Sequence, residues 1–472
     1  MKYSQLNNQI ETSEDSGVSF HVIILTILTI KLTIPLEVNK MKIGFISLGC
    51  SKNLVDSEKM MAMLKSGNHQ LVSNVEEAEA IIINTCGFIQ SAKEEAINTI
   101  FEMAQYKQHK CQKLIVVGCL AQRYKETLEQ EIPEIDAVIS IREYPNLADR
   151  LGKILGGEVM ETYGKSERLI SMKPWSAYLK IAEGCSNNCT YCAIPLIRGE
   201  NISTPMEELV AEAKVLAKNG VKELVLIAQD TTKYGLDLYG ELKLGDLLEE
   251  LHKIDEFHWI RVLYMYPDEI EDSLLEKMAQ LPKVLPYFDI PMQHASNKML
   301  ELMNRRGRKE DVLNLVTKIK ETFNQPTLRT TFIVGFPEEE QEDFNELLQF
   351  VKDIKWHRMG AFTYSPEEDT IAYDMNQTVS EELKQARLDQ LMKLQHEISL
   401  ENQKAYVGEM IEVLIEGKDA LKNMYIARSK ACAPDEVDGI IYVQTNQELT
   451  LGSFVNVEVI EALPYDLIAK TL

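Results

Sequence analysis

The sequence predicts an α/β protein in three parts: an N-terminal parallel-sheet domain, an open barrel of six βα units, and a small C-terminal β-barrel. Short apolar runs alternate with helical segments over residues 41–160 and again over 175–365. That alternation implies parallel strands whose faces are covered by helices. From about residue 405, short apolar runs follow one another without helices, as in small β-barrels. We therefore expect domains at 41–160, 171–400 and 404–472.

The bulk composition describes a strongly acidic globular chain. It has 472 residues, a formal net charge of −23 and a pI of about 4.9. Such a surface repels phosphate backbones, so bulk binding of nucleic acid is disfavoured. The eight cysteines are scattered and lack the density of a disulfide scaffold. We therefore expect a reducing, cytoplasmic compartment in which cysteines serve metal binding or catalysis.

Residues 1–40 are predicted to be a non-native or disordered extension. Their apolar run is broken by Lys31 and Pro35, and its uninterrupted core is too short to cross a bilayer. The acidic residues before that run do not suit a secretory signal. The sequence "MKIGFISLGC", which starts at Met41, resembles a natural protein start. We expect no membrane association.

Each of the three predicted strands of the first domain ends in a cysteine. "KIGFISLGC" ends at Cys50, "AEAIIINTC" at Cys86 and "KLIVVGC" at Cys119. Sites in parallel sheets form beyond the carboxyl ends of the strands, so one sheet brings these thiols together without local spacing. Taken alone, however, a buried cysteine at a strand end is often only a small hydrophobic residue.

The second domain begins with a strand that leads into a cysteine cluster. Its predicted strands read "AYLKIAE", "KELVLIAQ", "IRVLYMY", "YFDIPMQ", "RTTFIVGF" and "GAFTYS". Barrels of this kind carry their chemistry at the carboxyl ends of the strands. "EGCSNNCTYC" follows the first of these strands and places Cys185, Cys189 and Cys192 at C-x3-C-x2-C spacing. The cluster is therefore predicted to lie at the reactive end of the barrel.

Three thiolates suit an iron–sulfur cluster with one open iron. Cubane clusters normally take four cysteines, so with three of them one iron is free to bind a small molecule. Two other readings stay open. A structural zinc site usually adds a second cysteine pair or histidines, neither of which is nearby in the sequence. A chance group of structural cysteines is the other.

The C-x3-C-x2-C motif after the first barrel strand resembles the signature of radical S-adenosylmethionine enzymes. The order of cysteine sets and domains is similar to that of their methylthiotransferase family, which ends in a TRAM β-barrel. The resemblance implies two 4Fe–4S clusters: one on Cys185, Cys189 and Cys192, and an auxiliary one on Cys50, Cys86 and Cys119. It also implies two S-adenosylmethionine molecules, one as methyl donor and one as the source of a 5′-deoxyadenosyl radical. Cys111 and Cys432 match no ligand position and are interpreted as structural.

Within that family, the motifs resemble the branch that modifies the β-carbon of an aspartate in small-subunit ribosomal protein number twelve. Residues 404–472 hold six basic and eleven acidic residues, which suits a basic protein partner better than RNA, although the charge alone could serve solubility. The alternatives are a tRNA adenosine methylthiotransferase, a non-catalytic iron–sulfur protein and a zinc-held nucleic-acid-binding module. The motifs that resemble the ribosomal branch are "AQDTTKYGLDLYG", "RVLYMYP", "YFDIPMQHAS", "YSPEEDTIAY" and "APDEVDG".

Four further residues are predicted to contact S-adenosylmethionine. Tyr191 lies inside the cysteine loop and is expected near the adenine, and Gln229 ends the second barrel strand. Gln293 follows the fourth strand and Arg329 opens the fifth. The neighbouring His294 suits a polar core residue as well as a ligand contact. The radical chemistry also implies a low-potential electron donor such as flavodoxin or ferredoxin.

Overall fold

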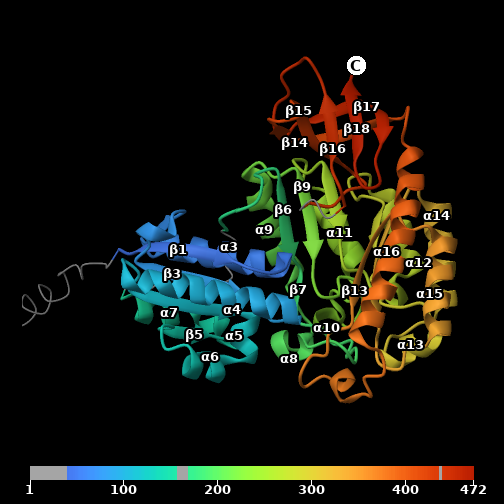
Figure 1. Ribbon diagram of the computed structural model, residues 1–472. Coiled ribbons are helices and arrows are strands. Elements are labelled where there is room, and N and C mark those ends of the chain that lie inside the picture. The colour runs from blue at the N-terminus through green and yellow to red at the C-terminus, as the bar shows by residue number, and fades with distance from the viewer. Residues whose placement is uncertain (1–39, 157–167, 435–437) are drawn as a thin grey trace, which may run out of the picture.

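The computed structural model describes residues 40–156, 168–434 and 438–472. The extension expected at residues 1–40 falls, apart from residue 40, outside them. Figure 1 shows three parts: an N-terminal domain at the left, a central barrel, and a small β-barrel at the top. The predicted fold class is confirmed by this arrangement.

The N-terminal domain is one parallel five-stranded sheet in the order β2-β1-β3-β4-β5. Its strands are rich in β-branched residues whose side chains alternate between two apolar cores. Helices α3 and α7 cover one face, while α4 and α6 cover the other. The elements are β1 (Lys42–Ser47), α3 (Ser51–Ser66), β2 (Gln70–Val72), β3 (Ala80–Thr85), α4 (Gln90–Ala104), β4 (Lys113–Gly118), α5 (Cys119–Arg123), α6 (Lys125–Glu131), β5 (Ala137–Ile139) and α7 (Leu147–Leu155).

The central barrel is an open arc of six parallel strands. Two three-stranded sheets, β6-β9-β10 and β11-β12-β13, meet near a single bridge between Ile260 and Val284. Helices cover the outer face. The strands are β6 (Ser176–Lys180), β9 (Glu223–Ile227), β10 (Trp259–Val262), β11 (Tyr287–Asp289), β12 (Thr327–Val334) and β13 (Arg358–Thr363). The outer helices are α9 (Met206–Lys218), α11 (Leu244–His252), α12 (Asp272–Gln280), α14 (Lys309–Thr322), α15 (Gln341–Ile354) and α16 (Glu381–Lys404).

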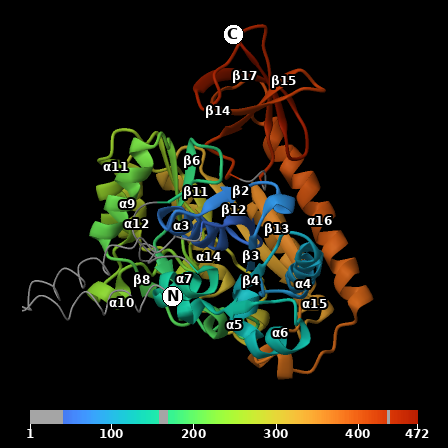
Figure 2. The same cartoon turned by 90° about the vertical axis from the view of Figure 1, so that its left-hand side faces the viewer.

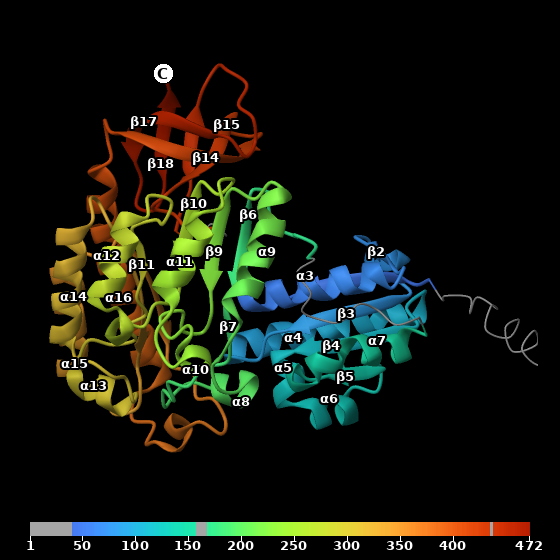
Figure 3. The same cartoon turned by 180° about the vertical axis from the view of Figure 1, so that it is seen from behind.

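Short elements line the carboxyl ends of the barrel strands. They are the ribbon of β7 (Ala182–Glu183) and β8 (Ile202–Ser203) and the helices α8 (Ile194–Arg198), α10 (Leu236–Tyr239) and α13 (Asn297–Leu302). Figure 3 shows α8 and α10 at the end of the barrel beside the N-terminal domain.

Helix α3 of the N-terminal domain packs into the inner face of the open barrel. Val55 lies in one apolar cluster with Tyr178, Val225 and Ile227, which point inward from β6 and β9. The opposite face of α3 packs on its own sheet through residues such as Met60 and Leu64. One helix therefore belongs to two cores, and the seam between the domains is packed around Val55.

The C-terminal domain is a closed barrel in the order β14-β15-β16-β18-β17. It docks on the amino ends of the central strands, because Arg428 donates to Ser176 and Glu223, the first residues of β6 and β9. Helix α16 runs alongside the central barrel toward it (Figure 2). Neither α16 nor any other described helix is apolar enough to span a membrane. The strands are β14 (Met410–Asp419), β15 (Met424–Ser429), β16 (Ile441–Gln444), β17 (Phe454–Ala462) and β18 (Leu467–Thr471).

Candidate active site

The structure brings Cys50, Cys86 and Cys119 together at one edge of the N-terminal sheet. Strands β1, β3 and β4 are neighbours, and one of these cysteines follows closely on each. Burial raises the pKa of the Cys119 thiol to about 12, and the charges of Cys50 and Cys86 add to that shift against the opposing charge of Arg198. Cysteine thiolates are the usual protein ligands of iron–sulfur clusters. The group thus has the donor chemistry of a metal-cluster site.

Glycines flank each of the three cysteines and leave no room for a side chain. A Cβ on Gly49 would lie 2.7 Å from Cβ of Cys86, and one on Gly87 would lie 2.9 Å from the backbone of Leu120. Gly118 has φ 98° and ψ −157°, a backbone region essentially reserved for glycine. The three chain segments therefore approach closely because they lack side chains where they meet.

The second cysteine set sits in a loop that is fastened at several points. The backbone N–H of Cys185 donates to the carbonyl of Gly199 at 3.0 Å, and that of Thr190 to the carbonyl of Met303 at 3.1 Å. Asn187 donates to Asp230 at 2.7 Å, which ties the loop to the segment that follows β9. The loop is therefore held in shape by three barrel segments.

The thiols of the second cysteine set are close neighbours. Burial raises the pKa of Cys192 well above its usual range, and the charges of Cys189 and Cys185 add to that shift. In the described part of the chain, no three histidine, cysteine or acidic side chains are placed to hold one metal ion. Cysteine thiolates are the usual protein ligands of an iron–sulfur cluster.

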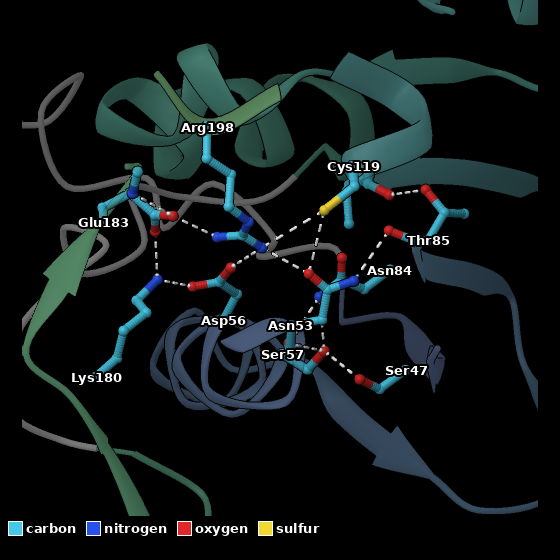
Figure 4. Close-up of polar contacts among 12 residues, drawn as sticks. Ser47, Asn53, Asp56, Ser57, Asn84, Thr85, Cys119, Lys180, Glu183 and Arg198 are labelled. Carbon is cyan, nitrogen blue, oxygen red and sulfur yellow. Dashed lines mark hydrogen bonds and ion pairs between the residues drawn. The ribbon is translucent and has the colours of Figure 1, made fainter. Parts of the chain in front are cut away.

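Arg198 reaches from the barrel to the N-terminal cysteine set through a buried polar network (Figure 4). It ends α8, directly after the second set, and its Nη2 lies 3.7 Å from Sγ of Cys119 and 2.6 Å from Oδ1 of Asn53. The same guanidinium pairs with Asp56 of α3 and with Glu183. Burial alone would raise the pKa of Glu183, but the charges of Lys180 and Arg198 lower it to about 2. Sequence reasoning missed Arg198, whose only local signal is its position after the cysteine loop.

A second arginine that sequence reasoning missed lies beside the loop that carries Cys185, Cys189 and Cys192. Nη1 of Arg305 is 3.8 Å from Sγ of Cys189, and its guanidinium stacks 4.0 Å above the ring of Tyr266. Each cysteine set therefore has one arginine directed at a sulfur atom; Arg198 is buried and Arg305 is half-buried.

The structure places Tyr191 and Gln293 together on the wall of a cavity of about 700 Å³. The cavity lies between residues 88–91 of the N-terminal domain and strands β12 and β13. Gln293 adopts φ 72°, and its backbone is held by hydrogen bonds to Thr331 and Ile333. Two of the residues predicted to contact S-adenosylmethionine thus line one cavity, and this cavity lies at the seam between the two domains.

The other predicted residues lie elsewhere on the inner side of the barrel. Gln229 is half-buried, two residues after β9, and does not line that cavity. Arg329 is the third residue of β12 and pairs with Asp289 at 2.7 Å. His294 is fully buried; its Nδ1 accepts from the N–H of Ser296, and its Nε2 faces Glu339 at 3.7 Å, as a polar core residue would.

Glu367, from the "YSPEEDTIAY" motif, links the barrel to the N-terminal domain. Its carboxylate pairs with Lys93 at 3.0 Å and with Arg123 at 2.7 Å. All three side chains are nearly buried. The acidic motif therefore fixes the domain seam beside the cavity.

Comparison with known proteins agrees with this architecture. Residues 42–140 match "Uncharacterized protein family UPF0004", 179–351 the "Radical SAM superfamily" and 407–472 the "TRAM domain". The solved radical S-adenosylmethionine methyltransferase TsrM from Kitasatospora setae aligns with a TM-score of 0.50 at 10% identity, covering 69% of this chain and 74% of that chain. That likeness is one of fold alone.

The fold and the cysteine loop define a radical S-adenosylmethionine enzyme of the methylthiotransferase class, which uses S-adenosylmethionine and 4Fe–4S clusters. A "Ribosomal protein uS12 methylthiotransferase RimO" from Caldicellulosiruptor saccharolyticus is 47% identical over 91% of this chain and all of that protein. One from Clostridioides difficile is 48% identical over 92% of this chain and 99% of that protein. The chain belongs to the RimO family.

Proposed function

We propose that this enzyme transfers a methylthio group to the β-carbon of an aspartate in ribosomal protein uS12. The observation that carries the proposal is the contact of Arg198, which follows the cysteine loop of the barrel in the chain, with Sγ of Cys119 in the N-terminal domain at 3.7 Å. A radical formed at one site and sulfur held at the other then reach the same substrate carbon. The enzyme would act in the cytoplasm, where ribosomal proteins are assembled.

Each cysteine set is proposed to hold one cluster. Cys185, Cys189 and Cys192 would hold the cluster that binds S-adenosylmethionine at its open iron, and Cys50, Cys86 and Cys119 the auxiliary one. When bound, these groups supply the electron that splits one S-adenosylmethionine, and the sulfur that receives a methyl group from the other. Radical abstraction suits this target because the β-C–H bond of an aspartate is not acidic enough for an ordinary base.

The side chains of this protein are proposed to bind and orient the reactants and to exclude water from them. Tyr191 and Gln293 are proposed to contact S-adenosylmethionine from the cavity wall, with Gln229 and Arg329 as further contacts. Arg198 and Arg305 direct N–H donors at a cysteine of each set, and such hydrogen bonds tune the potential of a cluster. The seam of Glu367, Lys93 and Arg123 keeps the two domains closed beside the cavity.

The C-terminal barrel is proposed to recruit the basic substrate by charge. Its excess of acidic residues suits a ribosomal protein better than RNA. Because it docks on the amino ends of the central strands, it contacts a part of the substrate remote from the target aspartate. A low-potential flavodoxin or ferredoxin is the expected electron donor.

The deciding experiment is anaerobic. The protein is reconstituted with iron and sulfide, then given S-adenosylmethionine, sulfide and a low-potential reductant, with either uS12 or tRNA lacking the modification. We expect mass spectrometry to find one methylthio group on an aspartate of uS12 and none on tRNA. A gain on a tRNA adenosine instead would assign the enzyme to the other branch. Deoxyadenosine with neither product would refute uS12 as the substrate.

A further inference from the structure

Lys52 is a buried lysine without a polar partner. Only 4% of its surface is exposed, yet its ammonium makes no hydrogen bond or ion pair with any described residue. Its one specific contact is with the ring of Tyr264, with Nζ 3.2 Å from the ring centroid. Every other buried lysine or arginine in the described ranges donates to an oxygen or sulfur atom: Lys93, Arg168, Arg198, Arg261, Arg358, Lys384, Arg387 and Arg428.

The side chain of Lys52 points from the N-terminal domain into the barrel. Residues three and four apart share one face of a helix, so Lys52 lies with Val55 and Asp56, both of which contact the barrel. Asn53 belongs to the other face and donates to the carbonyls of Leu48 and Thr85 in its own domain. The ammonium is therefore directed away from the N-terminal core.

This position is linked to both cysteine sets. Lys52 follows Cys50 by two residues, while Tyr264 follows the carboxyl end of β10. The carbonyl of Tyr264 accepts from the backbone and the hydroxyl of Thr231. Asp230, which precedes Thr231, accepts a hydrogen bond of 2.7 Å from Asn187 in the cysteine loop. Lys52 is thus linked along the chain to Cys50. Through Tyr264 and the Asp230–Thr231 segment it is linked to the loop of Cys185.

An unpaired ammonium in this position is disfavoured. Burial penalises a charge that has no counter-ion. Lys52 is also the second residue of α3, where the helix dipole disfavours a positive charge. The ring of Tyr264 offsets only part of these costs. An anion bound at this point would remove both penalties.

We propose that Lys52 binds the side-chain carboxylate of the target aspartate and so selects aspartate as the substrate. This inference rests on the proposed function. Of the two carboxylates in the reaction, that of S-adenosylmethionine is expected on the open iron of the radical-type cluster. The carboxylate of the substrate needs its own cation, within reach of both cysteine sets. Arg329, another cation on the inner face, is already paired with Asp289.

The test compares binding of uS12 with binding of a uS12 variant whose modified aspartate is asparagine. Dissociation constants are measured with the reconstituted, unreduced enzyme in the presence of S-adenosylmethionine, so that no turnover is needed. We expect the wild-type enzyme to prefer the aspartate form by about 30-fold or more, as for a desolvated charge pair. Lys52→Met should bring that ratio close to one, and Lys52→Arg should keep part of it.

Lys59→Met is the matched control, because Lys59 lies on the same helix and crosses the same seam to Glu212 at 3.2 Å. It should keep the wild-type ratio. The dissociation constant of S-adenosylmethionine should not change in Lys52→Met. An unchanged aspartate preference in Lys52→Met, or no preference in the wild type, overturns the inference. If the loss of preference is accompanied by a changed affinity for S-adenosylmethionine, Lys52 is assigned to that cofactor and the inference is also overturned.

The same enzymes are then reduced and assayed for methylthiolation. If the wild type modifies uS12 while Lys52→Met keeps its preference for aspartate, the inference fails and the proposed function stands. If the wild type leaves uS12 unmodified, the proposed function itself fails.

Discussion

The guanidinium of Arg198 lies 3.7 Å from the sulfur of Cys119, although 79 residues separate them in the chain. One residue of the barrel thereby reaches the cysteine set of another domain. Its remaining contacts, to Asp56 and Glu183, are buried ion pairs. Arg198 thus fastens the end of α8 to the N-terminal domain through several partners.

Replacement of Arg198 by methionine should loosen this seam. Removal of one partner from a buried ion pair typically costs about 3–5 kcal/mol in the free energy of unfolding, because the remaining charge is left uncompensated. The loss of an N–H donor to sulfur should also shift the reduction potential of the auxiliary cluster. Denaturant unfolding and a redox titration followed by electron paramagnetic resonance measure the two effects.

Arg150→Met is the control, since Arg150 is 43% exposed and pairs with Glu143 on the surface. It should change the unfolding free energy by no more than about 1 kcal/mol. Equal effects of the two substitutions would contradict the role given to Arg198.

Substitution of single cysteines should separate the two clusters. Cys192→Ala should lower the iron content to about half and abolish reductive cleavage of S-adenosylmethionine. Cys86→Ala should also halve the iron content but leave cleavage to deoxyadenosine intact, because the radical-type site is untouched. Iron analysis and chromatography of deoxyadenosine provide the measurements.

Cys111→Ala serves as the reference, because Cys111 is buried and its thiol donates to the carbonyl of Lys113 at 3.3 Å. It should keep the full iron content. Loss of iron in that variant, or full iron in Cys86→Ala, would contradict the proposed ligand sets.

A methyl group at Gly118 should prevent assembly of the auxiliary site. The Cβ of Gly118→Ala would lie 2.5 Å from the carbonyl oxygen of Thr85 and 2.8 Å from its nitrogen, so β3 and β4 would have to separate. We expect the iron content to fall by about half while the barrel keeps its cluster.

Gly240→Ala is the comparison variant. Gly240 also has positive φ, 77°, but a Cβ there would meet nothing within 4 Å. Its cost should be limited to the strain of a left-handed residue, about 1–2 kcal/mol, with full iron content. If both variants retained iron equally, crowding by a Cβ would not explain why position 118 is glycine.

The sequence predicted much of this architecture because the signals were local. The six barrel strands lie where their apolar runs predicted them, and the strands that end near Cys50, Cys86 and Cys119 are neighbours in one sheet. The roles of the cysteines as ligands remain predictions, as do the contacts with S-adenosylmethionine of Tyr191, Gln229, Gln293 and Arg329.

What the sequence did not reveal depends on distant pairing. Neither Arg198 nor Lys52 lies in a pattern that identifies its partner, because Cys119 and Tyr264 are brought to them only by the docking of α3 in the barrel. Glu367 was noticed only as part of a motif, and its pairing with Arg123 became evident only in the fold. Hydrophobic periodicity encodes elements, whereas contacts between domains require three-dimensional structure.

Neutralisation of Glu223 should weaken the attachment of the C-terminal barrel. Glu223 is fully buried and pairs with Arg428 of that barrel and with Arg261 at 2.9 Å. Glu223→Gln leaves both arginines undercompensated and should lower the free energy of unfolding by about 3–5 kcal/mol. The exposed pair of Glu250 and Lys253 gives the control, since Glu250→Gln should cost no more than about 1 kcal/mol.

The same carboxylate should make the docking sensitive to acid. Burial would raise the pKa of Glu223, but the charges of Arg428 and Arg261 outweigh that effect and hold the pKa below its usual range. A depressed folded-state pKa contributes stability above the unfolded value of about 4.3, and that contribution is lost as pH falls through the folded value. The wild type should therefore lose more stability than Glu223→Gln as pH falls from about 5 to 3. Parallel loss in both proteins, measured by denaturant unfolding across that range, would show that Glu223 does not hold the barrel through its charge.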